Sequence, residues 1–482
     1  MKSRRLNPTE AAEAQPTLQG PSRPWTLALT SVAFFMVALD SLVVVTALPS
    51  IHRDLGADLS TLEWTVNAFT LAFAAGIITA AALGDRVGRL RVFVSGLGLF
   101  TLASAACALA PSAEILIAAR TVQGIGAAMV MPLSLTILAA AFPPERRGAI
   151  VGIWGGIGGL AVASGPLVGG AVTQGLDWHW IFWVNVPIGL LAIVLSLARL
   201  AESHGPTTRL DLPAIVLVAG GATALVWGLI RAGDTGWGSP AIAMLSLGIL
   251  LIAGFVAWER RASHPMLPVT LFRSRAFSAA NTTGFLMAGA IFSAAFLIAQ
   301  YLQFVLGYSP LNTGLRLLPW TATPLVVAPL AGRLSDRIGT RPVLVAGMLL
   351  QGIGLAWVAT VATAGVEYGQ LVVPLVVAGV GISMALPVTP TAVLGAVAPG
   401  DMGKASGVNS TLQRFGAAFA IAIAAAVFAA NGHLGTATSF TAGFRPALAV
   451  VAGLSVVGAI TALAIGPRRL AATAAQPQST AA

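Results

Sequence analysis

The sequence predicts an all-α polytopic membrane protein with fourteen transmembrane helices: two six-helix halves and two inserted helices. Three observations predict this fold class, namely the composition, a series of long apolar stretches, and an internal repeat. Of the 482 residues, 56% are hydrophobic and only 9% are charged, whereas soluble domains carry about 25% charged residues. We therefore expect most of the chain to lie within a lipid bilayer.

The apolar stretches give the positions of the expected helices. About 20 residues are needed to cross the hydrocarbon core, and fourteen stretches approach or exceed that length, the seventh and eighth being the least distinct. The first of them has no small-residue cleavage site after it, so we expect a retained helix and not a secretory signal. The stretches cover residues 25–49, 61–83, 91–110, 114–141, 149–172, 178–199, 211–231, 240–258, 277–303, 315–332, 341–363, 370–397, 404–430 and 443–465.

The placement of basic residues gives the expected orientation. Cytoplasmic loops of membrane proteins are enriched in Lys and Arg. Placing the N-terminus inside puts 21 of the 27 basic residues on cytoplasmic segments and four on external loops, with Arg120 and Arg414 inside apolar stretches. We therefore expect a multi-pass protein of the inner (cytoplasmic) membrane with both termini in the cytoplasm. The net charge of +10 follows from these loops, so no nucleic-acid partner is expected.

An internal repeat divides the chain into two homologous halves. Residues 124–132, GIGAAMVMP, recur as residues 379–387, GVGISMALP, and residues 85–88, DRVG, recur as residues 336–339, DRIG. These offsets of 255 and 251 residues span eight stretches, an even number, so the two halves run in the same direction. The repeat predicts a pseudo-two-fold axis along the membrane normal, with a substrate site near the midplane where the halves meet.

The repeat also sets the expected domain boundaries. The two inserted stretches, the seventh and eighth, separate the homologous halves, and polar tails flank them. We expect a cytoplasmic N-terminal tail over 1–24, an N-terminal half over 25–200, a linker with the inserted helices over 201–275, a C-terminal half over 276–466, and a cytoplasmic C-terminal tail over 467–482.

No pattern of catalytic or metal-binding residues is visible. The single cysteine, Cys107, lies in an apolar stretch, and the five histidines lack metal-ligand spacing. The sequence contains neither a phosphate-binding loop nor a nucleophile elbow. We therefore expect a protein that is not an enzyme and that uses no metal and no cofactor.

Two charged residues in the first half are the main functional candidates. A charge at the bilayer centre costs roughly 2.5–3.5 kcal/mol on insertion scales, so such residues are usually functional. Asp40 lies nine residues from the outer end of its stretch at Pro49, and Arg120 lies six residues from the outer end near Glu114, so their depths are similar. In the second half, Leu375 occupies the position equivalent to Arg120, and no acidic residue occupies the position equivalent to Asp40. The alternative is that Asp40 only fixes helix packing.

The loop after the second stretch, and its repeat, resemble a motif of the major facilitator superfamily. Residues 83–91, LGDRVGRLR, and 332–341, GRLSDRIGTR, are similar to the pattern G-x-L-x-D-R-x-G-R/x-R/K, with Ala81 in place of the first glycine. The resemblance implies a cytoplasmic latch that opens and closes with alternating access; a topological anchor is the alternative. The latch residues would be Gly84, Asp85, Arg86, Gly88, Arg89, Gly332, Asp336, Arg337 and Gly339.

Two further motifs resemble the fourteen-helix drug:proton antiporter branch of this superfamily, the EmrB/QacA type. Residues 165–170, GPLVGG, are similar to the antiporter signature G-P-x-x-G-G, which the second half lacks. Residues 178–189, WHWIFWVNVPIG, resemble W-R-W-x-F-x-x-N-x-P-x-G, with His179 replacing arginine. Small residues at such spacing allow close helix contact. The antiporter motif would consist of Gly165, Pro166, Gly169 and Gly170.

The resemblance implies a proton-coupled antiporter that exports amphipathic, cationic or aromatic drugs and antibiotics by alternating access. Asp40 and Arg120 would couple protons to transport, because a proton and a cationic substrate could compete for one carboxylate. The expected partners are a small-molecule substrate, protons and the lipid bilayer, and the protein would act as a monomer. Candidate residues of the substrate cavity are Asn185, Gln300, Gln303, Trp320, Asn409 and Arg414.

Alternatives remain at this point. A dedicated exporter of one endogenous metabolite or antibiotic, acting in self-resistance, would have the same motifs. A membrane receptor or scaffold that does not transport is the third possibility. Arg414 could line the cavity, neutralise a distant acid, or extend towards the cytoplasmic face.

Overall fold

The computed structural model describes residues 22–205, 211–262, 269–398 and 401–466. Within these residues all regular secondary structure is helical. Each of the fourteen predicted stretches falls on one helix or on two consecutive helices. The all-α membrane fold predicted from composition and apolar stretches is confirmed.

The first half contains seven helices, of which the last two are consecutive pieces of one stretch. Asp58 caps the second of these seven by accepting a hydrogen bond from the Thr61 amide at 2.9 Å. The helices are α2 (Ser22–Leu55), α3 (Leu59–Val87), α4 (Arg89–Ala108), α5 (Ala113–Ala141), α6 (Pro144–Gly175), α7 (Trp180–Trp183) and α8 (Asn185–Arg199).

The insert and the second half follow in the same order. The insert is a pair of helices, α9 (Leu212–Thr235) and α10 (Ser239–Arg261). A short 3₁₀ helix, η1 (Val269–Arg273), leads into the second half. Its helices are α11 (Arg275–Gln300) with a π-helical extension η2 (Tyr301–Val305), α12 (Pro310–Thr321), α13 (Pro324–Ile338), α14 (Thr340–Val361), α15 (Tyr368–Leu394), α16 (Met402–Asn431) and α17 (Ala437–Leu463).

Twelve helices of the described residues are long and apolar enough to cross a membrane. The 32-residue α6 and the consecutive pair α12 and α13 occupy the other two predicted stretches. The stretch 315–332, predicted as one helix, is therefore interrupted. Pro324 begins the second piece, where its missing N–H and fixed φ suit a helix start but not a helix interior.

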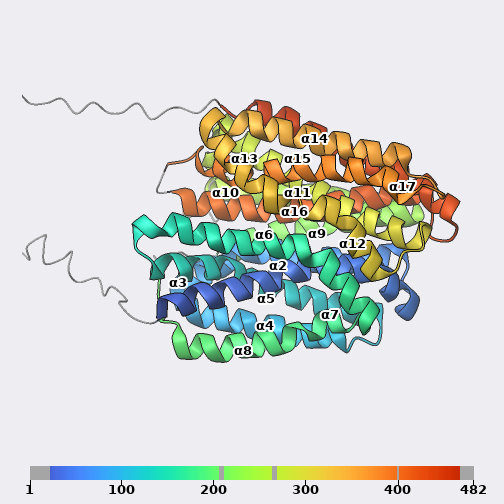
Figure 1. The fold of residues 1–482 in the computed structure, drawn as a ribbon. Coiled ribbons are helices and arrows are strands. Elements are labelled where there is room, and N and C mark those ends of the chain that lie inside the picture. The colour runs from blue at the N-terminus through green and yellow to red at the C-terminus, as the bar shows by residue number, and fades with distance from the viewer. Residues whose placement is uncertain (1–21, 206–210, 263–268, 399–400, 467–482) are drawn as a thin grey trace, which may run out of the picture.

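The two halves form two adjacent bundles (Figure 1). Helices α2 to α8 lie on one side and α11 to α17 on the other, and α2 begins at the same end of the molecule at which α17 finishes. In the orientation predicted from the sequence this is the inner, cytoplasmic end. The opposite end, where α2 finishes and α3 begins, is the outer end.

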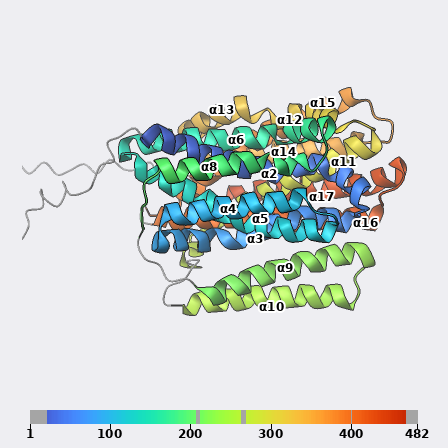
Figure 2. The same ribbon diagram turned by 90° about the horizontal axis from the view of Figure 1, so that it is seen from below.

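The inserted helices lie against the outside of the bundle as a hairpin (Figure 2). Helix α9 packs on both α3 of the first half and α16 of the second half. Its contact stripe is Ala222, Val226 and Ile230, four residues apart, which cluster with Leu71 of α3 and Ala418 of α16. The hairpin therefore covers the line along which α3 and α16 meet.

Candidate functional site

The centre of the candidate site is the carboxylate of Asp40, in the middle of α2. This side chain is 1% exposed and accepts three hydrogen bonds. Arg120 donates at 2.5 Å, and the side-chain amides of Gln123 and Asn185 each donate at 3.0 Å. The structure thus brings together the two charges that the sequence placed at similar depth.

Arg120 is held as firmly as its partner. Its Nη1 also donates to Gln123 Oε1 at 2.7 Å, and its Nε donates to the Thr65 carbonyl at 3.3 Å. The guanidinium carbon lies 4.2 Å from the centroid of the Phe69 ring and 5.7 Å from that of Phe182. Aromatic faces attract cations, so three hydrogen bonds and two aromatic rings hold this charge.

Ser104 completes the network. Its hydroxyl accepts hydrogen bonds from Gln123 at 3.2 Å and Asn185 at 3.0 Å, and it donates to the Phe182 carbonyl. All these residues belong to the first half, so the ion pair lies inside the first bundle. Removing one partner of such a buried pair typically costs about 3–5 kcal/mol. A change in the charge of Asp40 would therefore alter hydrogen bonds to several helices at once.

Gln123 and Ser104 were not predicted from the sequence. Gln123 carried a usable signal, because it follows Arg120 by three residues and so shares its helix face. Ser104 carried none, since serine in an apolar helix most often bonds its own backbone.

The antiporter motif fits α6 against two other helices. A Cβ atom at Gly165 would lie 2.9 Å from Leu42 Cβ on α2, and one at Gly169 would overlap Thr46 and the Val43 carbonyl. Gly170 faces the second half, where a Cβ atom would overlap the Pro310 carbonyl of α12.

The contact between α6 and α12 is reciprocal. A Cβ atom at Gly314 of α12 would lie 2.5 Å from the Pro166 carbonyl oxygen of α6. The glycines of the motif therefore let α6 pack closely against α2 on one face and against α12 on another. The contact with α12 connects the two halves.

Further contacts close the outer end between the halves. Gln303 Nε2 in η2 donates to the Thr46 carbonyl of α2 at 2.9 Å. The Leu311 amide of α12 donates to Gln174 Oε1 at the end of α6 at 3.2 Å. Both hydrogen bonds join the two halves near the outer end, one at α2 and one at α6.

The first loop predicted to act as a latch is bound to the segment that follows α8. Arg89 pairs with Asp85 at 2.8 Å, and the carboxylate of Glu202 accepts from the backbone amides of Leu90 at 2.8 Å and Arg91 at 3.2 Å. Glu202 thus caps the positive N-terminus of α4 from outside that helix. This residue was not predicted, because its partners lie over a hundred positions away in the chain.

The glycines of the two predicted latch loops differ in conformation and packing. Gly88 and Gly339 have φ values of +124° and +91°, which side-chain-bearing residues rarely adopt, and Gly84 packs against Leu133 of α5. Nothing lies within 4 Å of a Cβ atom at Gly332. The remaining latch side chains, Arg86, Asp336 and Arg337, are exposed.

The six predicted cavity residues do not form one site. Asn185 belongs to the Asp40 network, and Gln303 belongs to the outer contact described above. Asn409 accepts from Gln413 at 2.6 Å and donates to Asn281 at 3.4 Å, within the second half.

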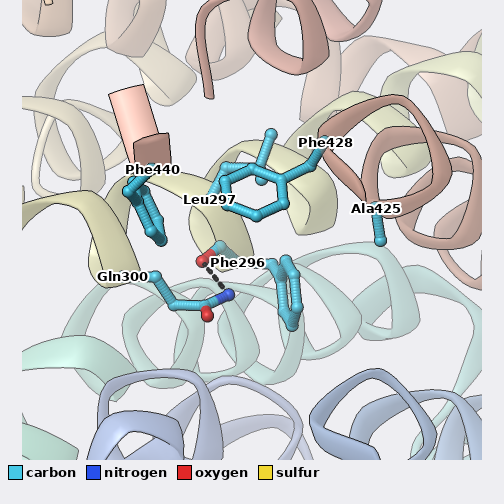
Figure 3. A pocket seen from close by; sticks show the side chains of 6 residues that line it. All are labelled: Phe296, Leu297, Gln300, Ala425, Phe428 and Phe440. Carbon is cyan, nitrogen blue, oxygen red and sulfur yellow. Dashed lines mark hydrogen bonds between the residues drawn. The ribbon is translucent and has the colours of Figure 1, made fainter. Parts of the chain in front are cut away.

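Gln300 and Trp320 are buried in the second half. Gln300 donates to the Phe296 carbonyl one turn earlier at 3.2 Å, beside the rings of Phe428 and Phe440 (Figure 3). These are packing positions in this conformation. Arg414 alone of the six reaches from the second half into the middle of the first, with its guanidinium carbon 4.4 Å from the Phe73 ring centroid.

An apolar groove of 580 Å³ runs along α2 between α6 and α8. Pro24 lines it near the inner end, and Leu39 and Asn185 line it near mid-membrane. Ligand sites are commonly of this size and largely apolar. The groove could hold the apolar part of an amphipathic molecule or a lipid chain beside the Asp40 network.

Known proteins resemble this chain over most of its length. Residues 30–317 and 280–481 match the family model described as Major Facilitator Superfamily. The tetracenomycin C resistance and export protein of Streptomyces glaucescens is 36% identical over 414 residues, which is 85% of this chain and 77% of that protein. The multidrug resistance protein Stp of Mycobacterium tuberculosis is 37% identical over 408 residues, which is 84% of this chain and 76% of that protein.

The fold is also found among solved structures. A crystal structure of the peptide transporter POT in complex with sulfate superposes with a TM-score of 0.67, covering 96% of this chain and 98% of that chain. The sequence identity is 19%, so this likeness concerns the fold alone.

Proposed function

The chain belongs to the major facilitator superfamily, and we propose that it exports amphipathic drugs or antibiotics across the cytoplasmic membrane in exchange for protons. The relatives named for drug resistance and export make it a drug efflux transporter and not an enzyme. Proton coupling, the inner membrane, cytoplasmic termini and a monomeric state are parts of the proposal. They are supported by the charge network, the distribution of arginines and the family motifs.

The observation that carries proton coupling is the buried pair of Asp40 and Arg120. As a carboxylate, Asp40 neutralises Arg120 and accepts three hydrogen bonds. Protonation would remove that negative charge and leave Arg120 as an unpaired cation in the first bundle. Because a lone buried charge is costly, the helices that carry the pair would adopt a different arrangement.

Helix α2 provides a physical path from the carboxylate to the outer end. Thr46 follows Asp40 by six residues on the same helix, about 9 Å along its axis. Its carbonyl accepts the hydrogen bond from Gln303 of the second half, and its side chain lies against Gly169 of α6. A movement of α2 on protonation would thus act directly on the contacts that hold the outer end closed.

The test is efflux from cells that express the protein, measured for a panel of fluorescent compounds and antibiotics with and without an uncoupler. Asp40→Asn should abolish uncoupler-sensitive efflux while the protein remains in the membrane. Asp177→Asn is the matched control, because its carboxylate lies on the surface, 52% exposed, beside His179. Full efflux by the Asp40→Asn variant would remove this carboxylate from the mechanism.

The breadth of the same panel separates two forms of the proposal. One relative is named for a single antibiotic and the other for multidrug resistance, so both a dedicated exporter and a multidrug exporter have support. Efflux of one chemical series only would favour the dedicated exporter. Efflux of unrelated series would favour the multidrug form.

A further inference from the structure

Arg414 lies at the membrane midplane between the two halves. It is 12 residues from the beginning of α16 and 17 from its end. Its guanidinium faces Phe73, which is 14 residues from either end of α3. At 1.5 Å per residue, Arg414 lies about 18 Å and about 26 Å from the two ends of its helix, and Phe73 lies about 21 Å from either end of its own. The side chain therefore points across the interface and not towards the cytoplasmic surface, which excludes one of the alternatives left open by the sequence.

The charge of Arg414 has no acidic partner among the residues that the structure describes. None of the five ion pairs in that part of the chain includes it. Its polar contact is Nη2 to the sulfur of Met131 at 3.9 Å, and a thioether is a weak acceptor. The centroids of the Phe73 and Phe292 rings lie 4.4 Å and 5.9 Å from its guanidinium carbon; they attract the cation but carry no negative charge that would neutralise it.

Asp40 cannot supply the missing negative charge in this conformation. Asp40 is 1% exposed, and its carboxylate is engaged by Arg120, Gln123 and Asn185 within the first bundle. The unneutralised charge at the interface between the halves, at the depth of the membrane midplane, is therefore the positive charge of Arg414. An unpaired cation is costly in a membrane and is usually retained because it binds something.

We propose that Arg414 binds the ionised acidic group, a carboxylate or phenolate, of an amphipathic aromatic substrate. The guanidinium fork matches a carboxylate with two parallel hydrogen bonds, and the half-buried Phe292 ring provides a surface for an aromatic body. This inference rests on the proposed export function and adds the charge class of the substrate. The negative charge proposed for the substrate is opposite in sign to that of a cation that would bind at Asp40.

Both halves contribute to this site. Phe73 and Met131 come from α3 and α5 of the first half, while Arg414 and Phe292 come from α16 and α11 of the second. When the halves move relative to each other, the distances between these groups must change. The affinity for the acidic group would then differ between the two access states, as transport requires.

The test is equilibrium binding to the full-length protein in lipid nanodiscs, with three probes of one shape: 1-naphthoate, 1-naphthamide and 1-naphthylmethylammonium. Wild type should bind the naphthoate most tightly. Arg414→Gln should weaken naphthoate binding by about tenfold or more, the effect of losing one charge-assisted hydrogen bond, and leave the amide unchanged. Arg414→Lys should retain part of the preference.

The matched control is Arg316→Gln. This arginine also lies between aromatic rings, 3.8 Å from the Tyr308 centroid and 5.1 Å from that of Tyr368, but near the outer end of the second half. It should leave the ranking of the probes unchanged. If Arg414→Gln does not fold, the proposal is still tested by comparing how wild type and Arg414→Lys rank the three probes.

The proposal is overturned if wild type prefers the ammonium probe, or if Arg414→Gln binds naphthoate as wild type does. Uncoupler-sensitive drug efflux without a naphthoate preference would refute the anion site alone. Naphthoate binding that depends on Arg414, in a protein without proton-linked efflux, would refute the proposed coupling and keep the site.

Discussion

Gly170 gives the sharpest test of how the two halves are joined. In Gly170→Ala the new methyl group would overlap the Pro310 carbonyl oxygen and lie 3.0 Å from Leu311 Cα. These are backbone atoms and cannot rotate aside, so α12 would have to move by about 1 Å to restore normal contact. Such overpacking costs about 1–3 kcal/mol.

That cost falls only on conformations in which α6 touches α12. Alanine's better helix propensity acts in every folded conformation and cancels from the comparison. The balance should therefore shift away from the closed outer end by about 1–3 kcal/mol, or about 5- to 150-fold.

The assay is the labelling rate of a buried cysteine by a membrane-impermeant maleimide added outside. Thr46→Cys provides the reporter, because Thr46 is 0% exposed and its carbonyl binds Gln303 across the halves. The single native cysteine, Cys107, is first replaced by alanine. Gly170→Ala should raise the labelling rate by the factor given above.

Gly156→Ala is the control on the same helix, since nothing lies within 4 Å of its Cβ position. It should leave the labelling rate unchanged. The reasoning is refuted if Gly170→Ala labels at the parent rate, or if both alanine variants raise the rate equally.

Three further predictions concern stability in detergent. Asp40→Asn and Arg120→Gln should each lower the unfolding free energy by about 3–5 kcal/mol, and the double variant should lose less than their sum, because the two charges are coupled. Glu202→Ala should cost about 1 kcal/mol by uncapping α4. Gly88→Ala should cost about 1–3 kcal/mol because of its φ of +124°. Denaturant titration followed by tryptophan fluorescence measures all three.

Each of these has a defined contrary result. Additive losses in the double variant would mean that the buried pair is not energetically coupled. Glu367→Gln, at a helix start with no side-chain cap hydrogen bond, should be neutral, and an equal loss there would contradict the capping argument. Gly98→Ala, with open space around it and ordinary φ, should not destabilise, so a similar loss at Gly98 and Gly88 would contradict the conformational argument.

The sequence predicted most of the fold because long apolar stretches and an internal repeat leave few alternatives in a bilayer. The depth of Asp40 and Arg120 could be counted along each helix, and the structure joins them. The break between α12 and α13 could not be placed, since proline is tolerated inside membrane helices. Pro166 and Pro132 lie within continuous helices, whereas Pro324 begins a new one.

The candidate cavity was harder to predict because polarity alone does not say which way a side chain faces. Gln300 bonds its own helix, and Asn185 turns into the first bundle. Only Arg414 among these faces the other half at midplane. Contacts of high sequence separation, such as Glu202 with α4, leave no local pattern at all.

The hairpin of α9 and α10 makes two flanks of the protein different within the plane of the membrane. Its α9 touches α3 and α16, so lipid is kept from that flank, and the described residues place no such cover over α6 and α12. Lipid would therefore lie directly against α6 and α12, but not against α3 and α16 behind the hairpin. Since α9 packs on both halves, a movement of one half relative to the other must slide α9 against at least one of them. The insert would therefore resist that movement as well as cover one flank.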